Sequence, residues 1–209
     1  MKVPFNPESF LLLQKSGGAD GGNTPALFLA SGQRVSGVHV NPMFRVPHYE
    51  YHVEEWKNLK DDFLSSLHVK NPDNIPSGSD YSVTTSYWDE FDYRDWLPFL
   101  EMVKPYISRI PSTETVTRVW YQTAQQYDYH TAHTHGSVGW SAVFYAHFNP
   151  EVHEATKFYC PFTNIMGDVE LYCPDVREGD LIVFPAFLLH EAPLNKSTEE
   201  RTIISFNLV

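Results

Sequence analysis

The stretch that decides the fold is the run Leu181-Ile182-Val183-Phe184, followed after a turn-rich segment by Arg201-Thr202-Ile203-Ile204-Ser205-Phe206-Asn207-Leu208. The first run is continuously apolar and follows the turn Glu178-Gly179-Asp180, a pattern typical of a strand buried on both faces. The second run is rich in β-branched and aromatic residues, which favour strands. Both runs therefore predict strands of a packed β-structure.

The strand pattern continues upstream through most of the C-terminal half. Further strand-like runs cover residues 115–123, 138–148, 156–161 and 169–173. Six strands separated by turns indicate a jelly-roll sandwich. We therefore expect a mainly β fold, a double-stranded β-helix of the jelly-roll, cupin-like type. One or two strands from residues 25–90 are expected to complete the sheets, and Tyr81–Trp88 alternates enough to be one of them.

The N-terminal half predicts two flanking helices. Apolar residues recur at spacings of three and four in Val53–Leu67, and a second helical pattern runs from Asp95 to about Ile107, where Pro105 is expected to kink or end the helix. We expect one domain over 1–209. Its N-terminal elaboration (1–110) holds the helices outside the sandwich, and its jelly-roll core is 111–209.

Composition excludes several classes of protein. The chain has 209 residues, 42% of them hydrophobic and 15% aromatic, which indicates a folded globular protein. Its net charge is 15 − 26 = −11 without a basic run, so nucleic acid is not expected as a partner. It contains no apolar stretch long enough for a membrane span and no signal-peptide pattern. Cys160 and Cys173 make no disulfide framework, so a cytoplasmic location is the default. A homodimer is compatible with the sequence, but no sequence feature specifies the oligomeric state.

His133-Thr134-His135 is the first candidate metal motif. Residues two apart face the same way on a strand, but lie roughly 200° apart around a helix, so they can share an ion only on extended chain. Ten histidines in this length give roughly 0.4 such pairs by chance, so two unrelated imidazoles are the alternative. His130 would face the other side of a regular strand, where it would support the site or lie at the surface.

His190 and Arg201 form the second part of the pattern. The segment between them is a turn, so we expect the strands that end at His190 and begin at Arg201 to pair antiparallel, which would bring Arg201 near His190. A structural histidine and a salt bridge from Arg201 to Glu199 or Glu200 are the alternatives.

In this order and spacing, the parts resemble the Fe(II)/2-oxoglutarate-dependent dioxygenase superfamily. The resemblance covers about residues 115–209. It rests on Trp120, on His133-Thr134-His135-Gly136-Ser137, on Trp140–Tyr145, and on the tail from Gly179 through His190 and Arg201 to Asn207. The superfamily usually has His-x-Asp or His-x-Glu, whereas this chain has His135 in the carboxylate position. A three-histidine site has one negative charge fewer, which should weaken Fe(II) binding.

The resemblance implies a cofactor and a co-substrate. Fe(II) would be held by His133, His135 and His190, and 2-oxoglutarate and O₂ would react there to hydroxylate a substrate. Arg201 would clamp the distal carboxylate of 2-oxoglutarate, because a guanidinium fits a carboxylate bidentately. Ser205 lies on the same strand face and could add a hydroxyl. Tyr145 and Gln122 resemble further positions that contact 2-oxoglutarate, although Tyr145 also fits a core aromatic.

Two other readings stay open at this point. One is a cupin-like metalloprotein that binds Zn, Mn or Ni without 2-oxoglutarate, and the other is a catalytically inactive family member. Arg201 discriminates, because a cupin without 2-oxoglutarate does not need it. The sequence does not indicate the substrate. It also does not show which aromatic residues line a substrate mouth rather than the core, among those at 120, 121, 127, 129, 140 and 159.

Overall fold

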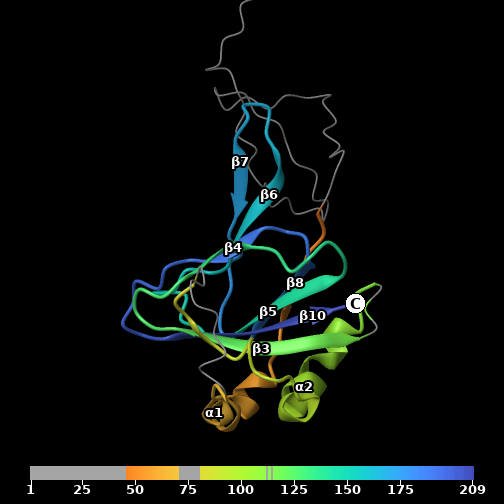
Figure 1. The fold of residues 1–209 in the computed structure, drawn as a ribbon, viewed down its shortest axis with the longest axis vertical. Helices are drawn as coiled ribbons and strands as arrows, with labels where there is room; N and C mark the ends of the chain where they lie inside the picture. Colours follow the sequence, from red (N-terminus) through yellow and green to blue (C-terminus); the bar gives the residue numbers. More distant parts are fainter. Residues whose placement is uncertain (1–45, 71–80, 112, 114) are drawn as a thin grey trace, which may run out of the picture. The chain divides into compact units, whose positions relative to one another are not determined.

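The structure is a computed structural model that describes residues 46–70, 81–111, 113 and 115–209. The layout of 1–209 as one domain stays a prediction, because residues 1–45 lie outside the described part. Within that part, two antiparallel sheets, two α-helices and a short 3₁₀ helix form the fold (Figure 1).

The larger sheet has six strands. Their order is β1 (Tyr49–His52), β8 (Asp180–Pro185), β5 (Trp140–His147), β10 (Arg201–Leu208), β3 (Val116–Ala124) and β2 (Thr84–Thr85). The smaller sheet has the order β4 (His130–His133), β9 (His190–Ala192), β6 (Lys157–Thr163) and β7 (Val169–Tyr172). The sheets pack face to face, with the ring of Phe158 in β6 lying 4.8 Å from that of Phe184 in β8. This arrangement confirms the predicted double-stranded β-helix.

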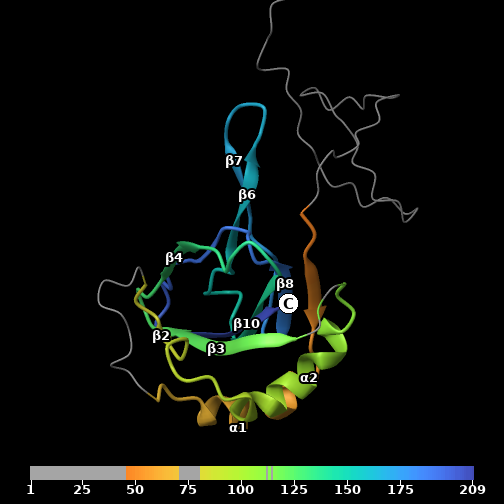
Figure 2. The same ribbon diagram turned by 45° about the vertical axis from the view of Figure 1, so that its right-hand side comes forward.

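The helices cover the opposite face of the larger sheet. They are α1 (Trp56–Ser66), the short 3₁₀ helix η3 (Tyr93–Trp96) and α2 (Leu97–Ile107) (Figures 1 and 2). Phe99 of α2 contacts Phe144 and Phe206 of the sheet, with ring centroids 5.3 and 5.9 Å away. The predicted helices are therefore confirmed, and α2 continues through Pro105 before it ends at Ile107.

The alternation of side chains along the strands determines which hydrophobic core each face of the larger sheet packs into. Phe144, Ile204 and Phe206 belong to the core beneath the helices. Tyr145 and Ile203, each next to one of these in the chain, belong to the core between the sheets. Because side chains alternate with a period of two, Arg201 and Ser205 share the inner face of β10 with Ile203.

Two predictions about strands are wrong. Only Thr84–Thr85 of the predicted strand Tyr81–Trp88 pairs with β3, and Tyr81 makes an isolated bridge to His130. The strand that begins at His190 pairs with β4 and β6, whereas β10 pairs with β3 and β5. The segment between them therefore crosses from one sheet to the other instead of closing a hairpin. It is anchored at Asn195, whose amide donates to the carbonyls of Ala124 and Glu199.

The β6–β7 hairpin extends from the smaller sheet beyond the sandwich (Figure 2). Cys160 lies in β6 and Cys173 directly follows β7. Both are free thiols. In the described ranges, neither α-helix is long and apolar enough to span a bilayer.

Candidate metal centre and co-substrate pocket

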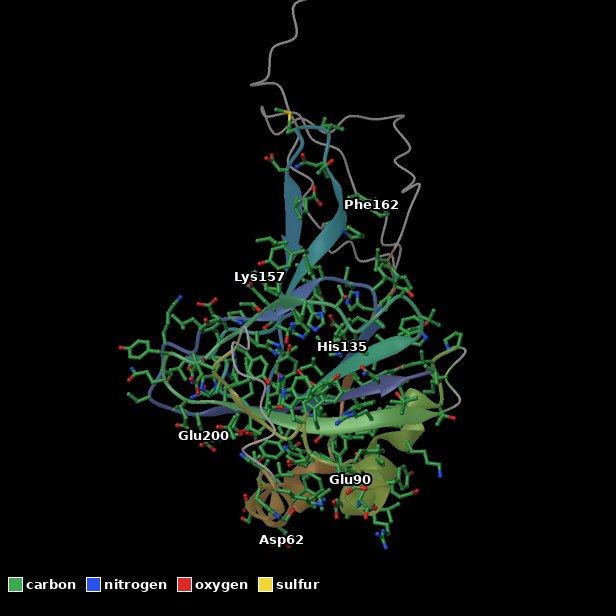
Figure 3. All side chains as sticks on the ribbon, in the orientation of Figure 1. Asp62, Glu90, His135, Lys157, Phe162 and Glu200 are labelled. Atoms are coloured by element: carbon green, nitrogen blue, oxygen red, sulfur yellow. The ribbon has the colours of Figure 1, made fainter. Side chains whose placement is uncertain are left out.

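Three imidazoles converge between the sheets. His133 and His190 are direct register partners of β4 and β9, and their ring centroids lie 4.4 Å apart. His135 follows the end of β4, where its backbone N–H donates to the carbonyl of Ala186 at 2.9 Å. Its ring lies 5.1 Å from each of the other two, in the interior of the sandwich (Figure 3). Each residue offers one ligand atom within 4.8 Å of the others.

Backbone hydrogen bonds set the tautomers of two of these histidines. Nδ1 of His133 lies 2.7 Å from the carbonyl of Thr131, and Nδ1 of His190 lies 2.9 Å from that of Leu188. A carbonyl oxygen only accepts, so each Nδ1 carries the hydrogen and each Nε2 keeps its lone pair. A second contact that orients the ring in this way is typical of metal-binding histidines.

The site keeps its imidazoles uncharged. Burial lowers the pKa of His133, lowers that of His190 well below its usual value, and together with His133 lowers the pKa of His135 to about 4. Neutral imidazole is the form that binds metals such as iron and zinc. The donor set therefore fits a divalent ion without a prior loss of protons near neutral pH.

These shifts predict an acid-sensitive metal-free protein. Histidines whose pKa is lowered by folding bind protons more readily in the unfolded chain, so acid favours the unfolded state. Their contribution to the free energy of unfolding is therefore fully present above about pH 6.5 and decreases as the pH falls. Each such histidine contributes up to about 1.4 kcal/mol per pH unit. Urea unfolding in EDTA at pH 7, 6 and 5 measures the slope. His190→Gln should reduce it and His68→Gln, an exposed control, should not; equal slopes in all three proteins would contradict the prediction.

His130 lies against the cluster, so its predicted place on the opposite face is wrong. Its ring stacks on that of His133 at 4.0 Å and 16°. The ladder between β4 and β9 is irregular between His130 and His133, which breaks the alternation of a regular strand. Burial, with the neighbouring His133 and His135, lowers the pKa of His130 to about 3. Gln122 lies 3.0 Å from its Nδ1.

A small cavity adjoins the three imidazoles on the side of the larger sheet. Its volume is about 20 Å³, and its polar lining includes Gln122, Thr156 and Ser205. This volume is about that of a single water site, so 2-oxoglutarate needs side chains there to move. Tyr145 is fully buried beside it, and its hydroxyl accepts from the backbone N–H of Thr156 at 3.2 Å. Burial raises the pKa of Tyr145 to about 12, so the phenol stays protonated.

Arg201 is a buried cation near this cavity. It is 4% exposed, and its Nη1 and Nη2 donate to the carbonyls of Glu154 and Pro193, both at 2.8 Å. It does not line the cavity directly, and burial lowers its pKa. Among the described residues, no carboxylate forms an ion pair with it. Because an unpaired buried charge is costly, this guanidinium is suited to an anionic ligand.

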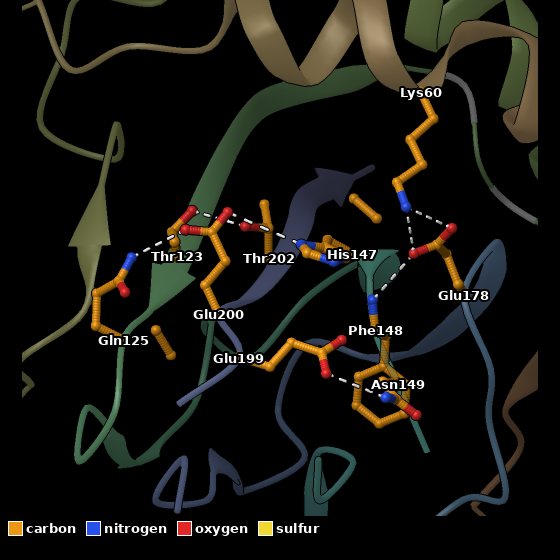
Figure 4. Close-up of polar contacts among 12 residues, drawn as sticks. Lys60, Thr123, Gln125, His147, Phe148, Asn149, Glu178, Glu199, Glu200 and Thr202 are labelled. Atoms are coloured by element: carbon orange, nitrogen blue, oxygen red, sulfur yellow. Dashed lines mark hydrogen bonds and ion pairs between the residues drawn. The ribbon is translucent and has the colours of Figure 1, made fainter. Parts of the chain in front are cut away.

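The alternative of a surface salt bridge for Arg201 does not hold. The carboxylate of Glu199 accepts from the amide of Asn149 at 3.1 Å (Figure 4). The carboxylate of Glu200 accepts from Gln125 at 2.9 Å and lies 3.8 Å from His147. Both neighbouring acids are thus engaged elsewhere, and Arg201 is turned to the opposite side, into the sandwich.

Sequence reasoning missed the other residues that line the site. Thr156 begins the segment into β6, and nothing in its local pattern marks it. Tyr81, Tyr87 and Trp88 line a second cavity, of about 190 Å³, next to His133 and His135. Their aromatic character was the available signal, but no spacing rule connects residues 81–88 to residues 133–135.

The comparison with protein families agrees with the chemistry of this donor set. The family described as "Putative 2OG-Fe(II) oxygenase" matches residues 118–207, which include the three histidines and Arg201. The matched segment is less than half of the chain. Together with the three converging imidazoles, the match supports an Fe(II)- and 2-oxoglutarate-dependent dioxygenase that uses O₂. No curated protein matches the sequence closely enough to count as a relative.

Solved structures share the fold at low sequence identity. The epimerase SnoN from nogalamycin biosynthesis is 12% identical, with a TM-score of 0.56, and the alignment covers 79% of this chain and 78% of that one. A prolyl hydroxylase from Trichoplax adhaerens is 11% identical (TM-score 0.54; 77% and 83% covered). HygX from Streptomyces hygroscopicus, solved with nickel and 2-oxoglutarate bound, is 10% identical (TM-score 0.54; 78% and 82% covered). These likenesses support the double-stranded β-helix.

Proposed function

We propose that the oxygenase is a hydroxylase in which His133, His135 and His190 hold the iron and Arg201 anchors 2-oxoglutarate. The observation that carries this proposal is the convergence of three neutral imidazoles, two of which have Nδ1 bound to a carbonyl and Nε2 free. Three protein ligands leave coordination positions open, as a catalytic site for two further ligands requires.

The protein's own groups would position the co-substrate. The keto-acid end of 2-oxoglutarate would lie at the metal, and the distal carboxylate would lie toward Arg201, with the hydroxyl of Ser205 beside it. Tyr145 remains protonated, so its O–H can donate to a carboxylate rather than repel it. Gln122 lies between this cavity and the aromatic one, and its amide would contact either the co-substrate or the substrate.

When bound, iron and 2-oxoglutarate supply oxidising power: O₂ and 2-oxoglutarate are consumed with one C–H bond, and succinate, CO₂ and one hydroxyl group are formed. Most residues that line the inner cavity are buried, which would limit the access of water to this reaction. The test is formation of succinate from 2-oxoglutarate by protein supplied with Fe(II), ascorbate and O₂. Slow turnover is expected without a primary substrate. Iron-loaded protein that neither binds nor consumes 2-oxoglutarate would instead be an inactive family member.

His135→Asp tests the departure from the usual carboxylate ligand. An aspartate would restore the common set of two histidines and one acid and add a negative charge beside the cation. We therefore expect this variant to retain iron or bind it more tightly, measured by competition with a chelator. His135→Ala is the control and should weaken retention. Loss of iron in the aspartate variant would show that His135 does not occupy the place of that carboxylate.

A further inference from the structure

The second cavity points to the class of group that the oxygenase acts on. It lies beside His133 and His135, shares Trp120 and Gln122 with the smaller cavity, and measures about 190 Å³. This is below the usual range for a whole drug-sized ligand, so the volume suits one side chain or one ring. Its walls come from residues 81–88, from β3 and from the segment that carries the histidines.

The walls of this cavity are aromatic and carry no formal charge. Four aromatic side chains line it, namely Tyr81, Tyr87, Trp88 and Trp120, and no Lys, Arg, Asp or Glu is among its described lining residues. The rings form a continuous series. Trp120 lies 5.4 Å from the ring of His135, Tyr87 packs its edge on Trp120 at 5.1 Å, and Trp88 packs on Tyr87 at 4.9 Å. The series thus reaches from the candidate metal centre to Trp88, which is 38% exposed.

Several polar atoms in these walls already have partners within the protein. The indole N–H of Trp88 donates to the hydroxyl of Tyr81. The hydroxyl of Thr85 donates to the carbonyl of Tyr121 and accepts from the N–H of Tyr87. The amide of Gln122 is bound to His130. A group that enters this cavity therefore meets mainly ring faces, and these polar groups of Trp88, Thr85 and Gln122 are already engaged.

The nearest cation does not alter this conclusion. The guanidinium of Arg118 lies 4.7 Å from the ring centroid of Tyr87 and donates to the carbonyls of Tyr87 and Asp89. It does not line the cavity. A charged group placed between these walls would lose its hydration without gaining a counter-ion, which is strongly unfavourable.

We propose that this cavity receives an uncharged aromatic ring of the substrate, which the oxygenase holds beside His133 and His135 for oxidation. This inference rests on the proposed function for the reaction, but the binding preference itself can be measured without turnover. A cation held on the ring faces alone is the competing chemistry. It is disfavoured because no acid among the described lining residues would fix it.

The experiment uses capped amino acids that differ only in the side chain. The probes are N-acetyl-phenylalanine methylamide and the corresponding lysine and glutamate derivatives. Binding is measured by saturation-transfer NMR on protein loaded with Zn(II), which is diamagnetic and accepts three imidazoles. The phenylalanine probe should bind at least about tenfold more tightly than the two charged probes, because only they would bury an unpaired charge. A preference for either charged probe, or no binding of the phenylalanine probe, would overturn the proposal.

Two variants locate the binding. Trp88→Ala should weaken binding of the phenylalanine probe about three- to tenfold, because one ring contact is lost. Tyr93→Ala removes a similarly exposed ring that does not line the cavity and should have no effect. Equal effects of both variants would place the probe elsewhere and overturn the proposal.

Thr134→Glu adds an anion to an exposed lining position and should increase binding of the lysine probe, a gain that misfolding cannot produce.

Succinate formation measured in parallel on iron-loaded protein separates the two hypotheses. If the ring binds as expected while 2-oxoglutarate is not consumed, the hydroxylase proposal fails and the aromatic site stands. If 2-oxoglutarate is consumed while no probe binds, the hydroxylase proposal stands and the assignment of an aromatic ring is wrong.

Discussion

His190→Ala is expected to abolish retention of iron and, with it, the consumption of 2-oxoglutarate. His190 is the most buried of the three candidate ligands at 3% exposed, and its Nδ1–H bond to Leu188 directs Nε2 toward the other two. An alanine leaves two imidazoles, which is too few to hold the ion firmly in competition with water. His133→Ala should have the same effect, since His133 is its register partner.

The measurement is metal content after dialysis against a weak chelator, together with succinate formation. His68→Ala removes an exposed histidine far along the chain and serves as the control. Circular dichroism must show that each variant keeps its fold, because His190 also contacts the rings of Phe158 and Phe184 at 5.8 and 4.7 Å. Folded His133→Ala and His190→Ala proteins with unchanged metal content would show that the ion binds elsewhere.

Arg201→Ala is expected to weaken binding of 2-oxoglutarate by roughly thirtyfold or more while iron is retained. A distal carboxylate buried in the sandwich needs a cation, and Arg201 is a buried cation with no ion pair among the described residues. Loss of one partner of such a charge-assisted contact costs on the order of 2–5 kcal/mol. Arg201→Lys should recover part of the affinity, because an ammonium lacks the planar fork of a guanidinium.

Calorimetric titration of 2-oxoglutarate into iron-loaded protein without O₂ measures this affinity. Arg94→Ala is the matched control, because it removes an equal charge from a side chain that is 83% exposed. The carbonyls of Glu154 and Pro193 would lose their donors in Arg201→Ala, so thermal unfolding must be compared as well. An unchanged affinity in a stable variant would assign the distal carboxylate to another group.

The sequence by itself determined the fold class and the candidate metal ligands. Strand patterns extend through the C-terminal half, and the structure confirms each of the six predicted strands there, because alternation and continuous apolar runs report directly on burial. The trio His133, His135 and His190 was also predictable, since ligand spacing is a local property for the first two and the family resemblance supplies the third. That these residues bind iron stays a prediction.

Only the tertiary structure decided how the site is assembled. His190 and Arg201 lie on different sheets, because the connection between them crosses the sandwich, and no local turn signal distinguishes a crossover from a hairpin. His130 joins the cluster because an irregular ladder breaks the two-residue period on which the sequence argument depended. The aromatic cavity joins residues 81–88 to Trp120 and the histidines through packing across the chain. Such contacts depend on which faces meet when the sheets close, and local pattern does not encode that.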